Sequence, residues 1–211
     1  MNLERPWHAS YPAGVPHQID TDEFPSIVSV PQASIEKYRD RPAFSNMGKS
    51  LTYAEVDKYS KQFAAYLLGE LKLKKGDRVA IMMPNCLQYP IALFGVLLAG
   101  LKVVNTNPMY PARELKHQLV DSGASAILVF DNFAKIVQDV VSETSVKQVI
   151  TTGLGDLLPF PKGAIVNFVL KYVKKMIPEY DIPGSVRFKN TLTLGQMHTL
   201  PPVDITPQDI A

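Results

Sequence analysis

The sequence predicts an α/β fold in which a mostly parallel sheet is flanked by helices. Between residues 51 and 151, short β-branched and apolar runs alternate with segments of helical period. The connections are short and carry turn residues such as Pro84-Asn85 and Gly123. Apolar residues make up 46% and charged residues 20% of the 211-residue chain, which is typical of a globular core. Strands and helices that alternate in this way form parallel sheets covered by helices.

An arm, a helix and a hairpin are expected before the alternating region. Residues 1–25 are rich in Pro, His and aromatic side chains without a period, which predicts an N-terminal arm. Residues 31–39 are expected to form a helix that begins at its proline, and residues 42–53 a hairpin. Thr52 and Glu55 have the spacing of a capping box for the helix that follows.

The alternating region then supplies the sheet. Strands are expected at residues 78–83, 102–105, 126–130 and 147–151, and helices at 87–100, 111–122 and 133–142. The uncharged run 79–101 is long enough to span a bilayer. Pro84 and Asn85 split it, which favours a strand, a turn and a buried helix.

Residues 26–211 are expected to form one domain, in which the amino-acid composition changes after Thr152. Residues 154–184 are rich in Pro and Gly and contain one strongly apolar stretch, which predicts an insertion-like amphipathic segment. Residues 185–211 are expected to alternate turns with short apolar pieces.

Composition and motif searches exclude several functions. The formal charge of +2 argues against nucleic acid as a partner. A single cysteine, Cys86, and a first segment without an apolar signal region predict a cytoplasmic protein. The sequence holds no Walker phosphate loop, no nucleophile elbow and no histidine spacing typical of a metal site. A dinucleotide-dependent oxidoreductase is poorly supported, because its glycine fingerprint is missing.

Several segments nevertheless resemble the adenylate-forming superfamily. Leu-Thr-Tyr-Ala-Glu-Val at 51–56 is similar to its first core motif, and residues 97–108 to its second. Lys-Gly-Asp-Arg-Val-Ala at 75–80, the following Met-Pro-Asn and residues 119–129 continue the pattern. Residues 11–16, 63–67 and 162–169 are similar to the bacterial long-chain-fatty-acid–CoA ligases within this superfamily.

The resemblance implies the first part of the large N-terminal domain of a two-step ligase. A fatty acid and ATP would give an acyl-adenylate with magnesium, and CoA would then displace AMP. The family's phosphate loop follows a segment like Pro-Gln-Asp-Ile-Ala at 207–211, where this chain ends. We therefore assign no catalytic, cofactor-binding or metal residue to this chain and expect it to be inactive alone. The expected partners are a long-chain fatty acid, the remainder of the polypeptide, a peripheral membrane contact and a second copy in a homodimer.

Two further interpretations bear on function. The absence of catalytic motifs also fits a standalone α/β binding or regulatory module. Thr-Thr-Gly at 151–153 and Pro-Lys-Gly at 161–163 resemble the two halves of the superfamily's phosphate loop, but they are separated in this sequence. The seven intervening residues, which include Leu157, Leu158 and Phe160, disfavour that loop, and two ordinary turns are expected instead.

A membrane contact is suggested by residues 164–177, Ala-Ile-Val-Asn-Phe-Val-Leu-Lys-Tyr-Val-Lys-Lys-Met-Ile. On one continuous helix, its asparagine and lysines fall on an arc of about a hundred degrees opposite a broad apolar arc. Such a helix is about 21 Å long, too short to span a bilayer, but suited to an anionic membrane interface. A helix packed on the domain with its lysines in water is the alternative. The candidate membrane-contact residues are Ile165, Phe168, Val169, Lys171, Tyr172, Lys174 and Lys175.

Overall fold

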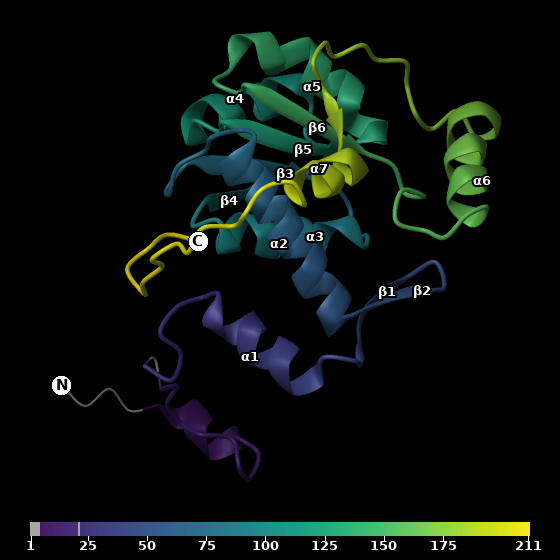
Figure 1. The fold of residues 1–211 in the computed structure, drawn as a ribbon. Coiled ribbons are helices and arrows are strands. Elements are labelled where there is room, and N and C mark those ends of the chain that lie inside the picture. Colours follow the sequence, from purple (N-terminus) through teal and green to yellow (C-terminus); the bar gives the residue numbers. More distant parts are fainter. Residues whose placement is uncertain (1–4, 21) are drawn as a thin grey trace.

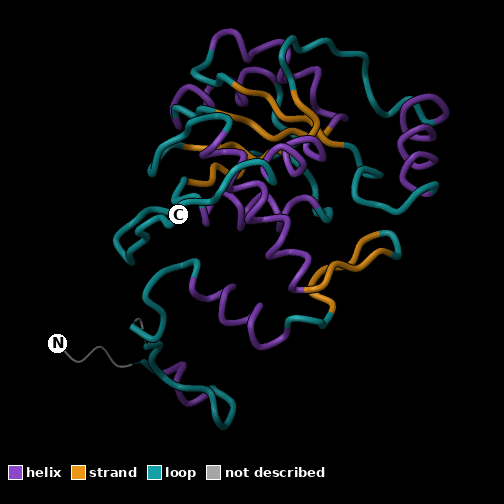
Figure 2. The backbone as a smooth tube through the Cα atoms, viewed as in Figure 1, coloured by secondary structure: helices purple, strands orange, loops and turns teal. Residues whose placement is uncertain are grey.

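A parallel sheet of five strands, covered by helices on both faces, forms the centre of the computed structural model, which describes residues 5–20 and 22–211 (Figures 1 and 2). The strand order is β4-β3-β5-β6-β7, and every neighbouring pair is parallel. The predicted fold class is therefore confirmed. The strands are β3 (Arg78–Met82), β4 (Lys102–Asn105), β5 (Ala126–Phe130), β6 (Gln148–Thr152) and β7 (Val186–Arg187).

Two apolar cores form because the side chains of a strand point alternately to opposite faces of the sheet. Val79 and Ile81 of β3 face one core, and Ala80 and Met82 face the other. The first core is closed by α2 (Tyr53–Gly69), α3 (Gln88–Leu98) and α7 (Phe188–Gly195). The second is closed by α4 (Ala112–Ser122) and α5 (Ala134–Val140), the latter flanked by 3-10 turns η2 (Asp131–Phe133) and η3 (Val141–Glu143).

The segment predicted to be a strand, a turn and a buried helix has that structure. β3 ends at Met82, Pro84 and Asn85 are exposed in the turn, and α3 follows. Among the residues that the structure describes, no helix is both long enough and apolar enough to cross a membrane.

The hairpin and its capping box are also confirmed. Strands β1 (Pro42–Asn46) and β2 (Lys49–Thr52) pair antiparallel. The Thr52 hydroxyl accepts a hydrogen bond from the Glu55 amide at 3.2 Å, and the Glu55 carboxylate accepts one from the Thr52 amide at 2.8 Å. These reciprocal bonds satisfy two amides that the start of α2 would otherwise leave unpaired.

Helix α1 (Ser29–Tyr38) begins two residues before Pro31, so the predicted start was wrong. A proline at the third helical position costs no hydrogen bond, because the first four amides of a helix have no partner inside it. The N-terminal arm contains a 3-10 turn, η1 (Pro6–Ser10). Residues 1–4 and 21 of the predicted arm lie outside the described residues.

The C-terminal part differs from its prediction. Residues 185–211 were expected to hold turns and short apolar pieces, but they contribute β7 and α7 to the domain. The spacing of Phe188 and Leu192 places both on one face of α7, where they are buried in the first core.

The apolar stretch at 164–177 was predicted to be one continuous α-helix, and this prediction was wrong. Helix α6 (Lys162–Phe168) gives way to a π-helix, η4 (Val169–Val173), and Lys175 adopts a left-handed conformation. The Lys174 amide bonds the Val169 carbonyl at 2.8 Å, a spacing of five residues. The wider turn changes the angle between side chains, so the arc calculated for 3.6 residues per turn does not hold beyond Phe168. Figure 1 shows α6 standing apart from the sheet, at the end of long connections.

Candidate functional site at the carboxyl edge of the sheet

Polar side chains from three parallel strands meet where those strands end. Asp131 directly follows β5, Thr151 and Thr152 end β6, and Arg187 ends β7. Ligands of open α/β sheets bind outside the carboxyl ends of the strands. This edge is therefore the candidate functional site of the chain.

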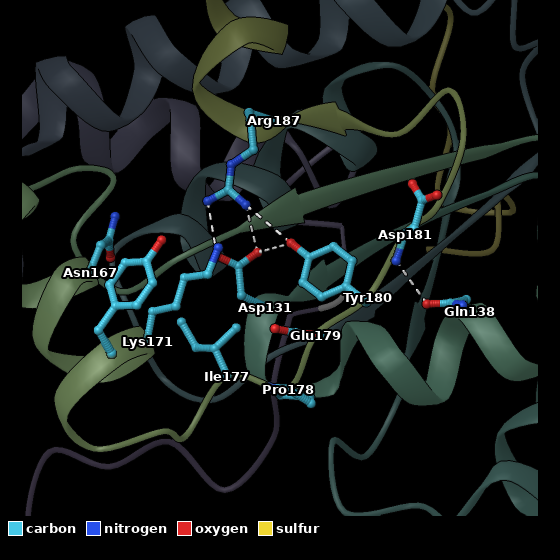
Figure 3. Close-up of a pocket in the computed structure, with 11 residues that line it drawn as sticks. Asp131, Gln138, Asn167, Lys171, Ile177, Pro178, Glu179, Tyr180, Asp181 and Arg187 are labelled. Carbon is cyan, nitrogen blue, oxygen red and sulfur yellow. Dashed lines mark hydrogen bonds and ion pairs between the residues drawn. The ribbon is translucent and has the colours of Figure 1, made fainter.

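Arg187 joins two carboxylates across this edge. Its Nη1 donates to Asp131 Oδ1 at 2.6 Å, and its Nη2 donates to Asp131 Oδ2 at 3.0 Å. Nη2 also donates to Asp156 Oδ2 at 2.7 Å. The Tyr180 hydroxyl donates to Asp131 Oδ1 at 2.9 Å (Figure 3). The guanidinium fork is thus occupied by carboxylate oxygens, an arrangement that suits its planar geometry.

Burial and charge shift the pKa values of two groups in this network. Burial lowers the pKa of Arg187, but hydrogen bonding and charge from Asp131, together with the charge of Asp156, outweigh burial and raise it above its ordinary value. The pKa of Tyr180 is raised, first by burial and then by the charge of Asp131. Arg187 therefore stays cationic and Tyr180 stays a neutral hydrogen-bond donor at physiological pH.

A second set of bonds ties α6 to the loop after β6. Asn167 of α6 accepts from the Gly155 amide at 2.8 Å and donates to Asp156 Oδ1 at 2.9 Å. A Cβ atom at Gly155 would lie 2.1 Å from the Gly163 carbonyl oxygen, so only glycine allows this approach. The loop after β6 and the start of α6 therefore lie in direct backbone contact.

The two halves of the apparent phosphate-loop motif were expected to be two ordinary turns, but the structure shows otherwise. Thr151 and Thr152 are buried residues of β6, and the later Lys162-Gly163 belongs to α6. Gln88 of α3 donates a hydrogen bond to the Gly153 carbonyl oxygen at 2.8 Å, so this backbone oxygen already has a partner within the protein. The motif is explained by a strand end and a helix start.

A cavity of about 810 Å³ opens beside the Arg187 network (Figure 3). It lies between the sheet edge and the segment that carries α6 and η4. Its wall is mixed polar and apolar: Asp131, Gln138, Asn167, Lys171, Tyr172, Ile177, Pro178, Glu179, Tyr180, Asp181 and Arg187.

Chemically, this arrangement holds a segment in place. The carboxylates of Asp131 and Asp156 are each only 10% exposed, and both are paired with Arg187. In residues 5–20 and 22–211, no three His, Cys, Asp or Glu side chains are grouped so as to hold a metal ion. The network therefore anchors the connection between β6 and β7 and leaves neither Asp131 nor Asp156 free for a ligand.

The candidate membrane-contact residues lie on α6, on η4 and directly after them. Ile165, Phe168 and Tyr172 are exposed, and Val169 is partly buried. The three lysines, Lys171, Lys174 and Lys175, are exposed. Lys171 and Tyr172 also line the cavity.

Sequence reasoning did not find the Arg187 network. The only local signal was Asp131, a charged residue directly after a predicted buried strand. Asp131 and Arg187 are 56 residues apart, and only the parallel order of β5, β6 and β7 brings them together.

A family model described as AMP-binding enzyme matches residues 31–211. The chain belongs to this family.

Among curated relatives, the long-chain-fatty-acid–CoA ligase of Escherichia coli O6:H1 is 48% identical over 209 residues. The match covers 99% of this chain and 37% of that protein. The ligase of Haemophilus influenzae matches with the same identity and coverage. The ligase of Bacillus subtilis is 36% identical over 81% of this chain and 30% of its own. The chain therefore spans about 37% of the length of the first of these relatives.

Two solved structures of CoA ligases share the fold. An anthranilate CoA ligase, AuaEII, in complex with anthranoyl-AMP, matches with a TM-score of 0.70 and 14% identity, over 90% of this chain and 32% of its own. A long-chain-fatty-acid–CoA ligase from Archaeoglobus fulgidus matches with a TM-score of 0.58 and 24% identity, over 67% of this chain and 29% of its own. At these identities the likeness concerns the fold alone.

Proposed function

We propose that the chain is part of an ATP-dependent ligase that activates long-chain fatty acids to acyl-CoA through an acyl-adenylate. The observation that carries the proposal is the 48% identity, over 99% of the chain, to long-chain-fatty-acid–CoA ligases of Escherichia coli and Haemophilus influenzae. The family match over residues 31–211 supports the adenylate-forming chemistry.

The proposed reaction has two balanced steps. A carboxylate oxygen of the fatty acid attacks the α-phosphorus of ATP, and the bond to pyrophosphate breaks. The CoA thiolate then attacks the acyl carbonyl carbon, and the bond to the AMP oxygen breaks. The adenylate is needed because a free carboxylate is a poor electrophile, whereas AMP is a good leaving group.

In the described residues, 5–20 and 22–211, no group of three or more His, Cys, Asp or Glu side chains fits a site for magnesium. Asp131 and Asp156 are the nearly buried carboxylates of the candidate site, and the Arg187 fork engages both. We therefore assign ATP, magnesium and CoA to the full-length protein and no catalytic residue to this chain. In this proposal, the chain supplies the sheet on which later segments complete the active site.

Activity of the full-length protein tests the proposal. With ATP, magnesium, CoA and oleate, we expect oleoyl-CoA and AMP to form in equal amounts, measured by mass spectrometry. Formation of ADP, or no oleoyl-CoA, would contradict it.

A matched test uses residues 1–211 alone. We expect neither acyl-adenylate formation nor micromolar ATP affinity by calorimetry, because the family's phosphate loop has no counterpart in these residues. Micromolar binding would contradict this expectation. A reading frame that ends at Ala211 would favour the standalone module instead. A cytoplasmic location and a homodimer stay predictions.

A further inference from the structure

The surface that α6, η4 and the next three residues present to solvent is largely apolar. Five large apolar side chains are each more than half exposed there. They are Ile165 at 57%, Phe168 at 58%, Tyr172 at 59%, Val173 at 62% and Met176 at 54%. We call these five residues the α6 face. Soluble proteins expose single apolar residues routinely, but a contiguous group marks an interaction site.

The polar contacts of the segment hold this orientation. Asn167 bonds the Gly155 amide and Asp156, so the polar side of α6 faces the domain. Lys162 donates to the Met47 carbonyl in the hairpin turn. At the other end, Asn132 Nδ2 donates to the Met176 carbonyl at 2.9 Å. A helix packed on a domain buries its apolar side, whereas this segment presents that side to solvent.

The charge of the segment has one sign. Residues 157–178 contain four lysines and no Asp or Glu. Lys171, Lys174 and Lys175 are exposed beside the α6 face, and Lys171 Nζ lies 5.3 Å from the centre of the Tyr172 ring. Exposed apolar residues bordered by lysines are the features of helices that lie in an anionic membrane interface.

We propose that the α6 face binds the surface of an anionic lipid bilayer, with Lys171, Lys174 and Lys175 at the level of the headgroups. α6 and η4 together have 12 residues and are at most about 18 Å long, so they lie in the interface and do not span it. A symmetric contact between two copies is disfavoured, because it would bring together two surfaces that both carry positive charge.

The choice of a lipid surface rests partly on the proposed function, because long-chain fatty acids partition into membranes. Binding at this surface would place the ligase where its substrate is concentrated. The lipid contact and the ligase reaction are nevertheless measured separately, so one can fail while the other holds.

Vesicle flotation of the full-length protein tests the proposal. The vesicles are phosphatidylcholine alone, or equal parts phosphatidylcholine and phosphatidylglycerol. We expect flotation with the anionic vesicles and much less with the neutral ones. Changing Lys171, Lys174 and Lys175 together to Glu should weaken partitioning at least about a hundredfold, because each lysine near an anionic surface contributes a factor of about five and each glutamate adds repulsion.

Two matched variants separate a local contact from a change in net charge or hydrophobicity. Lys58, Lys147 and Lys189 are exposed outside the segment, and changing all three to Glu alters the total charge equally. Phe168→Ser with Val173→Ser removes apolar area from the α6 face, whereas Met197→Ser removes a 78%-exposed apolar side chain elsewhere. We expect the charge control and Met197→Ser to float like the unaltered protein, and the Phe168/Val173 variant to float less.

Several results would overturn the lipid contact. One is equal flotation of the unaltered protein and the Lys171/Lys174/Lys175 variant. Another is a dimer in gel filtration that dissociates in the Phe168/Val173 variant without any flotation, since a second copy would then occupy the face. A third is hydroxyl-radical protection of Phe168 and Val173 in the vesicle-free protein, which would show that the remaining polypeptide covers them. Oleoyl-CoA formation in the same samples reports on the ligase proposal independently.

Discussion

Replacing Arg187 by methionine tests whether its network anchors the connection between β6 and β7. The substitution keeps a side chain of similar length but removes the cation that pairs with Asp131 and Asp156. Both carboxylates then remain only 10% exposed, with no positive partner. We expect the loop that they hold, together with α6, to open more often.

The magnitude follows from burial. Removing one partner of a fully buried ion pair costs about 3–5 kcal/mol. The Arg187 side chain is 37% exposed, so solvent screens part of the interaction, and we expect about 2 kcal/mol. Since a factor of ten corresponds to about 1.4 kcal/mol, local opening should rise roughly thirtyfold.

Hydrogen–deuterium exchange of the full-length protein measures this opening. The Gly153 amide donates to Asp156 Oδ2 at 2.9 Å and the Gly155 amide donates to Asn167, so both report directly on the loop. In Arg187→Met, their protection should fall roughly thirtyfold, while amides of β3 stay unchanged. Arg187→Lys should give an intermediate loss, because an ammonium does not reproduce the fork.

Neutralising the two carboxylates tests whether their unpaired charge causes the opening. Adding Asp131→Asn and Asp156→Asn to Arg187→Met should restore most of the protection at neutral pH. Unchanged protection in Arg187→Met would refute the anchoring role.

Three further substitutions and one chemical reaction test the fold. In Gly195→Ala, the added Cβ would lie 1.9 Å from the Gln62 carbonyl oxygen. We therefore expect α7 to be destabilised by about 1–3 kcal/mol, although alanine favours helices. A rise in the amide protection of α7 would contradict this. Thr52→Ala removes the α2 cap and should lower protection of the first turn by about 1 kcal/mol. The pKa of Glu55 is lowered, chiefly by the hydrogen bond from the Thr52 amide. The stabilisation of the fold by ionised Glu55 should therefore be complete above the ordinary glutamate pKa and be lost as the pH falls through the lower folded value. Glu55→Gln should remove this pH dependence. Burial raises the pKa of Cys86, so mass spectrometry should show its alkylation at least about tenfold slower in the native protein than in denaturant, and equal rates would contradict its burial.

The central sheet was predictable because its signals are local. The predicted strands at 102–105 and 126–130 have the bounds of β4 and β5, since each is a short β-branched or apolar run next to a turn. The Thr52–Glu55 cap depends on a spacing of three residues, so it too could be predicted from the sequence.

The remaining features depend on contacts between distant segments. β7 has only two residues, too few to show a period, and it is a strand because it pairs with β6. The Arg187 network needs that pairing, so it was not predictable. The π-helix at Val169–Val173 lies between Asn167 and the Met176 carbonyl, which are held by separate parts of the domain.

Oxygen tracing tests the proposed acyl-adenylate most directly. The full-length protein would be given ATP, magnesium, CoA and oleate whose carboxylate carries heavy oxygen. Attack of the carboxylate on the α-phosphorus leaves one substrate oxygen on the phosphate of AMP after the thiolate displaces it. Mass spectrometry should therefore find AMP heavier by one such oxygen and oleoyl-CoA retaining the other. Unlabelled AMP, with heavy oxygen in inorganic phosphate or pyrophosphate, would contradict an acyl-adenylate and with it the proposed function.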